Sequence, residues 1–147
     1  MIIIRKVELD DINNIFDLDS KTFYSESYKK EDFINYISDN NVFFICIYDD
    51  NDFLGYSLLK LFKPECELLK ICIKKEKRNK EYGYELFLYI LNHLKNNGYN
   101  KIFLEVRSDN DTAIRFYENN GFIIYNKRIN YYKNPNSDAL LYYKNIL

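Results

Sequence analysis

A carboxylate interrupts the apolar stretch Lys101 to Arg107 (KIFLEVR). In a strand, successive side chains lie on opposite faces, so one face is apolar and the other carries Phe103, Glu105 and Arg107. A Glu105 that faces a partly buried cleft would have its pKa raised toward that of a useful general base. An exposed face on which Glu105 pairs with Arg107 explains the same residues equally well. The stretch alone leaves both interpretations open.

Five basic side chains stand in the loop Lys74 to Lys80 (KKEKRNK), before the longest helical pattern of the chain. The free N–H groups and positive end of a helix bind phosphate, and basic neighbours strengthen such a site. A solvated charged loop is the simpler interpretation, which this feature alone favours. No P-loop pattern occurs, and Gly83 stands alone where a dinucleotide-binding fingerprint needs three glycines.

The segment 108–122 (SDNDTAIRFYENNGF) reads as a short helix that leads into a strand. Asn110 precedes the helix and Gly121 ends it. Tyr117 lies on the inner side of this helix and carries a hydroxyl whose ordinary pKa is near 10. Judged by packing alone it is a core aromatic, in a chain that holds 15 tyrosines.

A series of strands and helices must position these residues. The patterns predict strands over 2–7, 42–48, 53–62, 65–73, 101–106, from 122 onward and over 139–144, and helices over about 12–20, 29–38, 82–96 and 111–119. This order predicts an α/β protein with a mixed sheet. Its first half is antiparallel, and a strand–helix–strand crossover lies in the centre.

Size and composition limit the class of protein. The chain has 147 residues, and we expect a single domain over residues 1–147. Its 21 basic and 22 acidic side chains give a net charge of −1, which disfavours nucleic acid and membrane as partners. Three cysteines without C-x-x-C spacing and one histidine predict neither disulfides nor a metal site. We therefore expect a soluble protein of the reducing cytoplasm.

Together and in this order, the motifs resemble the GNAT acetyltransferase superfamily and, within it, the RimI-like alanine N-acetyltransferases of bacterial ribosomal proteins. The strongest part is LEVRSDNDTAIRFYENNGF (104–122), which is similar to the family pattern L-E-V-R-x-x-N-x-x-A-I-x-x-Y-x-x-x-G-F. ELLKICI (67–73) resembles the family's E-L-L-N-I-A-V strand, and NYYKNPNSDALLY (130–142) resembles its closing N-Y-Y…D-A segment. The resemblance spans nearly the whole chain.

The resemblance implies the GNAT fold, in which acetyl-CoA lies between two parallel strands that splay apart, here 67–73 and 101–106, without a metal. It assigns the pantetheine and the acetyl group to backbone groups of Ile71, Cys72 and Ile73. Asn110 is assigned to CoA further along the cofactor.

The resemblance also assigns the pyrophosphate to the loop that leads into the longest helix. The residues concerned are Arg78, Asn79, Lys80, Glu81, Tyr82, Gly83 and Tyr84. The family's loop reads Q/R-x-x-G-x-G/A, so Glu81 replaces the first glycine. Glu81 adds a Cβ and a negative charge where the backbone must approach phosphate closely. The basic neighbours offset part of that charge, and cofactor affinity is the property that we expect to change.

Direct acetyl transfer to an amine is the reaction that the resemblance implies. Glu105 is assigned as the base, directly or through a water, and Tyr117 as the acid that protonates the departing CoA thiolate. Glu67, on the neighbouring strand, is a competing base. The leading acceptor is the α-amine of a protein N-terminus, with a ribosomal protein as the candidate partner.

Two alternatives stay open. A GNAT enzyme acting on a small amine would share the cofactor residues and differ only in its acceptor groove. The pair Tyr131-Tyr132 and the loop to Asp138 favour a peptide groove. The second alternative is a CoA-binding module that has lost catalysis. The intact Glu105 and Tyr117 argue against this alternative.

Overall fold

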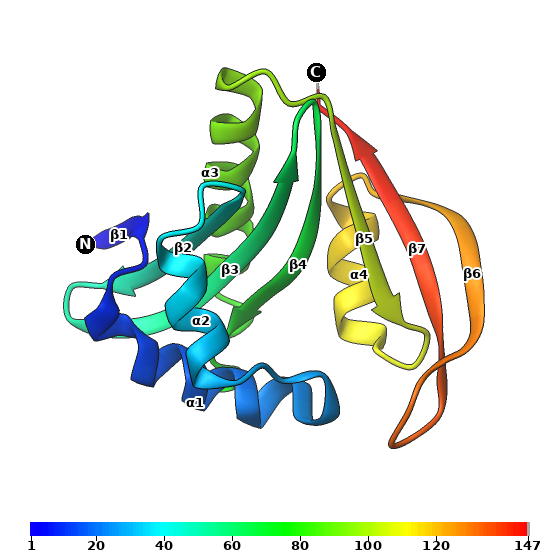
Figure 1. The fold of residues 1–147 in the computed structure, drawn as a ribbon, viewed down its shortest axis with the longest axis horizontal. Helices are drawn as coiled ribbons and strands as arrows, with labels where there is room; N and C mark the ends of the chain where they lie inside the picture. The colour runs from blue at the N-terminus through cyan, green and yellow to red at the C-terminus, as the bar shows by residue number, and fades with distance from the viewer. Residues whose placement is uncertain (147) are drawn as a thin grey trace.

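The structure, a computed structural model, describes residues 1–146 and contains one mixed sheet (Figure 1). Seven strands lie in the order β1-β2-β3-β4-β5-β7-β6. Their bounds are β1 Ile2–Lys6, β2 Val42–Asp49, β3 Asp52–Phe62, β4 Glu65–Ile73, β5 Lys101–Arg107, β6 Ile123–Tyr132 and β7 Ser137–Asn145. Neighbouring strands are antiparallel except β4 and β5, which are parallel. This confirms the predicted α/β mixed sheet with its antiparallel first half.

Helices cover both faces of the sheet. The helices are α1 (Ile12–Phe23), α2 (Lys30–Ile37), α3 (Tyr82–Asn96) and α4 (Asp111–Asn119). The first two pack on one face and the last two on the other (Figure 1). Strand β2 shows why the sequence folds this way, because Ile45 packs toward α3 while Phe44 and Cys46 pack toward α1 and α2. A strand buried on both faces reads as a continuous apolar run.

Two element boundaries differ from the sequence prediction by more than one residue. Helix α1 continues to Phe23, three residues beyond the expected end. Its last turn contacts β4, where the Sγ atom of Cys72 lies 3.4 Å from Thr22 Oγ1. Strand β7 begins at Ser137, two residues earlier than expected. The extension of α1 depends on a residue distant in sequence, which local periodicity does not reveal. At the start of β7, Ser137 pairs with Tyr132 across the hairpin, and the Asp138 carbonyl oxygen accepts a hydrogen bond from the Ser108 N–H at 2.9 Å.

The opening in the sheet arises from the shape of β4. Strands β4 and β5 pair over only three rungs, from Glu65 to Glu67 on β4. Beyond them the β3–β4 register shifts, so that Leu69 is an extra residue on β4, and such a bulge bends a strand. On β3, a Cβ at Gly55 would lie 2.1 Å from the Cys72 carbonyl oxygen, so glycine permits the close approach of the two strands. The bend confirms the predicted splayed pair.

Candidate active site

A cavity of about 590 Å³ opens where β4 and β5 diverge. Twelve of the thirteen residues that the sequence predicts for the site line it: Ile71, Cys72, Ile73, Arg78, Asn79, Glu81, Tyr82, Gly83, Tyr84, Glu105, Asn110 and Tyr117. Lys80 is exposed and is not among the lining residues. The structure therefore brings together segments that lie up to 46 residues apart in the chain (71 to 117).

The N-terminus of α3 forms one end of the cavity. The first N–H groups of a helix have no partner within it, and those at Tyr82 and Gly83 lie in the cavity wall. Glu81, just before the helix, has a left-handed backbone with φ of 66°. A Cβ at Gly83 would lie 3.4 Å from Phe116, so packing leaves space for a side chain and glycine keeps that space open. These features fit a pyrophosphate.

Two basic side chains of the loop before α3 are engaged by the protein itself. Arg78 donates from Nε to the Ile73 carbonyl oxygen at 2.9 Å and so fixes the loop to the end of β4. Lys77 pairs with Asp52 at 3.2 Å. The Asp52 carboxylate offsets the charge of Lys77, whereas Arg78, bonded to a neutral carbonyl, keeps its full positive charge near Glu81.

Helix α4 forms the adjoining wall. The Asn110 side chain caps this helix by accepting a hydrogen bond from the Ala113 N–H at 3.2 Å. Its position in the cavity wall thus has a structural reason as well as the predicted contact with CoA. Thr112, Arg115 and Asn119 of the same helix also line the cavity, and the sequence analysis did not single them out.

Tyr117 belongs to the core and also faces the cavity. It is 9% exposed, and its ring packs against Phe116 and Phe122 at centroid distances of 5.8 and 5.6 Å. Within residues 1–146 its hydroxyl makes no hydrogen bond to another protein group, and it is not sealed from solvent. Burial raises the pKa of Tyr117, so the hydroxyl keeps its proton at neutral pH.

Glu105 lies on the face of β5 opposite Leu104 and Val106, which pack in the core with Tyr117 of α4. Its side chain is 25% exposed, and its Oε1 lies 3.4 Å from Nε of Arg128 on β6. Arg107, the partner that the sequence offered, pairs instead with Glu26 and Asp109. Glu105 is therefore a member of the cavity wall and does not form the surface pair that was the competing interpretation.

Glu67, the competing base, occupies the last paired rung of β4. Burial and the negative charge of Glu105 raise the pKa of Glu67. Its side chain is not among those that line the cavity. On β6, the charge of Glu105 raises the pKa of Tyr131, while the neighbouring Tyr132 lines the cavity.

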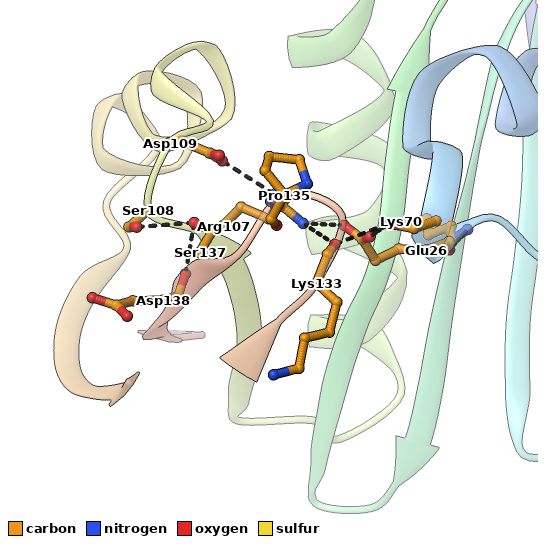
Figure 2. A network of polar contacts seen from close by, with 10 residues as sticks. Glu26, Lys70, Arg107, Ser108, Asp109, Lys133, Pro135, Ser137 and Asp138 are labelled. Atoms are coloured by element: carbon orange, nitrogen blue, oxygen red, sulfur yellow. Dashed lines mark hydrogen bonds and ion pairs between the residues drawn. The ribbon is translucent and has the colours of Figure 1, made fainter. Parts of the chain in front are cut away.

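Three polar residues that line the cavity do not belong to the site predicted from the sequence: Glu26, Lys70 and Arg107 (Figure 2). Glu26 lies in residues 24–29, hereafter the α1–α2 connection. The sequence could have indicated Lys70, since it is a charged residue within the apolar strand ELLKICI, at the position where the family's strand has Asn. No pattern in the sequence indicates Glu26, because its partners Lys70 and Arg107 lie 44 and 81 residues away in the chain.

Other features of the described chain bear on the class of protein. Cys46, Cys66 and Cys72 are buried free thiols. No helix among residues 1–146 is long and apolar enough to span a membrane. Within the same residues, no group of three or more His, Cys, Asp or Glu side chains is arranged to hold a metal ion.

A cavity between splayed parallel strands, with the N-terminus of a helix on one side and titratable side chains on the other, is typical of transferases that use a CoA thioester. The sequence model of the acetyltransferase (GNAT) family matches residues 9–122, so the chain belongs to this family. It is an N-acetyltransferase with acetyl-CoA as its co-substrate.

Relatives share the fold but differ in acceptor. A Bacillus subtilis protein, provisionally named a ribosomal protein bS18-alanine N-acetyltransferase, is 27% identical over 139 residues, covering 94% of this chain and 91% of the relative. The spermidine N(1)-acetyltransferase of Thermoplasma acidophilum is 27% identical over 139 residues, covering 81% and 86%. The crystal structure of the Escherichia coli ribosomal-protein-S18-alanine N-acetyltransferase superposes with a TM-score of 0.89 at 20% identity, covering 99% and 94%. These matches confirm the predicted resemblance.

Proposed function

We propose that this enzyme acetylates the α-amine of a protein N-terminus, with Glu105 as general base and Tyr117 as general acid. The observation that carries the proposal is that both side chains line one cavity from opposite faces of the splayed strands. An amine can therefore meet Glu105 on the α1 face while the leaving group meets Tyr117 on the α4 face. The bound acetyl thioester supplies the electrophile.

Each protein group has one step to perform. Glu105, directly or through a water, takes a proton from the α-ammonium, whose ordinary pKa near 8 makes this removal easy at neutral pH. The free amine then attacks the thioester carbonyl carbon. Backbone N–H groups along Ile71 to Ile73 of β4 are the candidate donors to the developing oxyanion. As the carbon–sulfur bond breaks, Tyr117 donates its proton to the thiolate. The nitrogen then loses its second proton through water, which restores the Tyr117 hydroxyl, and Glu105 releases its proton to solvent. No covalent enzyme intermediate is required.

The remaining assignments follow the predicted cofactor wall. We infer that Asn79 to Tyr84, including Glu81, surround the pyrophosphate, and that Asn110 contacts CoA beyond it. A ribosomal protein that begins with alanine is the acceptor that we favour, because the Bacillus subtilis relative covers nearly the full chain. The buried free thiols suit the reducing cytoplasm, where such a partner is found.

A polyamine is the second candidate acceptor. It is favoured by the two carboxylates of Glu67 and Glu105, which lie near each other on the α1 face and would attract a second ammonium. Arg128, which pairs with Glu105, opposes this attraction.

The test is an acetyl-transfer assay with mass-spectrometric readout. The acceptors are a peptide that begins with Ala, the same peptide with a blocked N-terminus and an internal lysine, and spermidine. We expect acetylation of the first peptide at its α-amine and little of the other two. Acetylation of spermidine alone would replace the protein acceptor by the polyamine and leave the family assignment unchanged.

A further inference from the structure

A second cavity, of about 290 Å³, lies beside the last turns of α3, the helix whose first turn lines the cavity between β4 and β5. Its wall also includes the end of β1, the C-terminal end of α2 and the turn between α2 and β2. The two cavities share no lining residue. The second cavity is therefore separate from the candidate active site.

Two side chains that can carry positive charge meet in this wall, Lys6 and His93. Lys6 follows Ile2 and Ile4 on the face of β1 that packs toward α3, so its side chain lies on the same side of the sheet as His93. Burial and the charge of Lys6 lower the pKa of His93, and no protein group within residues 1–146 bonds its ring. None of the ion pairs formed by these residues includes Lys6. An anion placed here would interact with Lys6 and with a protonated His93.

The other titratable groups of the wall leave this charge in place. Asp39 is exposed, and its Oδ1 accepts a hydrogen bond from the Asn41 N–H at 2.8 Å, within the turn between α2 and β2. Burial and the charges of Asp32 and Asp39 raise the pKa of Tyr36, so this hydroxyl stays neutral. The local positive charge therefore comes from Lys6 and, once protonated, from His93.

The remainder of the wall suits an apolar group. Ile37, Val42 and Leu61 line the cavity and are only half-buried. Phe43 stacks on the His93 ring with a centroid distance of 3.9 Å and an interplanar angle of 6°, which fixes the imidazole in the wall. The volume is at the lower end of the range for small-molecule pockets, which is about 300–1,000 Å³. These features fit a ligand with one negative group and a small apolar body.

We propose that the second cavity binds a small organic carboxylic acid, with its carboxylate at Lys6 and His93 and its apolar body against the half-buried aliphatic side chains. The carboxylate accepts hydrogen bonds from the Lys6 ammonium and from the protonated imidazole. Because the negative charge favours the protonated imidazole, binding raises the pKa of His93, and affinity rises as pH falls through that pKa. The proposal does not depend on the acceptor of acetyl transfer.

Titration followed by NMR tests the site directly, because His93 is the only histidine of the chain and gives a single imidazole signal. Benzoate is the probe, and acetate supplies the same carboxylate without the ring. Saturating benzoate should raise the pKa of His93 in the full chain, and benzoate should bind about 5-fold more tightly near pH 5.5 than near pH 8. Acetate should bind about 5-fold more weakly than benzoate, because it buries less apolar surface.

Three variants separate the local contact from general electrostatics. Lys6→Gln should raise the pKa of His93 in the free protein and weaken benzoate binding about 5-fold. Lys95→Gln is the matched control, because it removes an exposed positive charge two residues from His93 and outside the cavity wall. The control should change benzoate affinity less than about 2-fold, because solvent and salt screen an exposed charge. In His93→Gln, calorimetry should show benzoate binding that no longer depends on pH.

Three results would overturn the proposal. The first is a pKa of His93 that benzoate leaves unchanged. The second is acetate binding as tight as benzoate binding, which would exclude an apolar contact. The third is an equal loss of benzoate affinity in Lys6→Gln and Lys95→Gln, which would make the effect one of net charge.

Discussion

The two sides of the cavity are built from contacts of very different range. On the cofactor side, Arg78 holds Ile73 five residues away, and Asn110 caps a helix three residues on. On the acceptor side, Lys70 pairs with Asp19 across 51 residues and Arg107 with Glu26 across 81. The proposed cofactor side is therefore encoded in short sequence motifs. The proposed acceptor side forms only when segments distant in sequence come together in the fold.

This difference matches what the relatives share. The cofactor is common to a family, so local motifs suffice to preserve its site. Acceptors vary, as the ribosomal-protein and spermidine enzymes illustrate by name. The α1–α2 connection, whose Glu26 contacts Lys70 and Arg107, can change in sequence without altering the residues of the proposed cofactor wall.

The largest expected effect is on the acceptor side. Lys70→Met leaves the buried Asp19 carboxylate without its cation, which should lower the free energy of unfolding by about 3–5 kcal/mol. Lys77→Met, on the proposed cofactor side, removes a partly exposed pair with Asp52 and should leave the free energy of unfolding nearly unchanged, because solvent screens such a pair. Urea unfolding of both variants measures the contrast. Equal losses would mean that the acceptor side does not depend on its long-range charges.

The same contrast explains what the sequence could reveal. The splayed parallel pair and twelve of the thirteen predicted residues in the cavity wall were implied by the resemblance to the GNAT family, which rests on short motifs. Glu105 was recognised as a choice between a cleft and a pair with Arg107. Only the structure shows Arg128 beside it, because that neighbour comes from an edge strand paired through β7.

Other features depend on tertiary packing and could not be predicted. Helix α1 reaches Phe23 because its last turn meets β4, and the contacts of Glu26 join segments far apart in the chain. Lys80 was assigned with its loop, yet the left-handed residues Asn79 and Glu81 flank it and it remains exposed. Such backbone turns alternate side-chain directions in ways that a motif does not encode.

The next largest effect concerns Glu105, the proposed base, which lies on the proposed acceptor side. Glu105→Gln keeps the size of the side chain but removes its ability to take a proton, so turnover near pH 7 should fall about 10²- to 10³-fold. Activity with an Ala-first peptide should recover partly as pH rises through about 8, where the α-amine loses its proton unaided. A lysine acceptor would recover only near pH 10. Initial rates measured across this pH range distinguish an α-amine acceptor from a lysine acceptor.

Glu67→Gln is the matched control for the base, because Glu67 does not line the cavity. It should lose far less turnover than Glu105→Gln. A Glu105→Gln variant with wild-type rate, together with an inactive Glu67→Gln variant, would transfer the role of base to Glu67.

Tyr117, the proposed acid on the α4 face, gives a smaller effect. Tyr117→Phe removes a hydroxyl that has no hydrogen-bond partner within residues 1–146, so the fold and acetyl-CoA affinity should change little while turnover falls about 10²-fold. Tyr142→Phe is a matched control, since its hydroxyl bonds Glu118 at 2.7 Å and the residue does not line the cavity. Discontinuous acetyl-transfer assays measure turnover, and calorimetry measures acetyl-CoA affinity. Full turnover in Tyr117→Phe would leave Tyr117 as a core aromatic only.

The smallest effect is expected from Glu81→Gly on the cofactor side. Glu81 has a φ of 66°, a conformation that costs a non-glycine residue about 1 kcal/mol or more, so glycine should raise stability slightly. Removing its negative charge from the predicted pyrophosphate site should tighten acetyl-CoA binding about 5-fold, the equivalent of about 1 kcal/mol in a solvated site. Thermal unfolding and calorimetry report the two gains separately.

Glu81→Gln separates the two causes, because it removes the charge and keeps the Cβ. It should tighten acetyl-CoA binding without raising stability, and the gain in affinity should shrink as salt is added. Glycine and glutamine variants with equal affinity would show that only the charge weakens binding. An affinity unchanged in both would place the Glu81 carboxylate away from the phosphates.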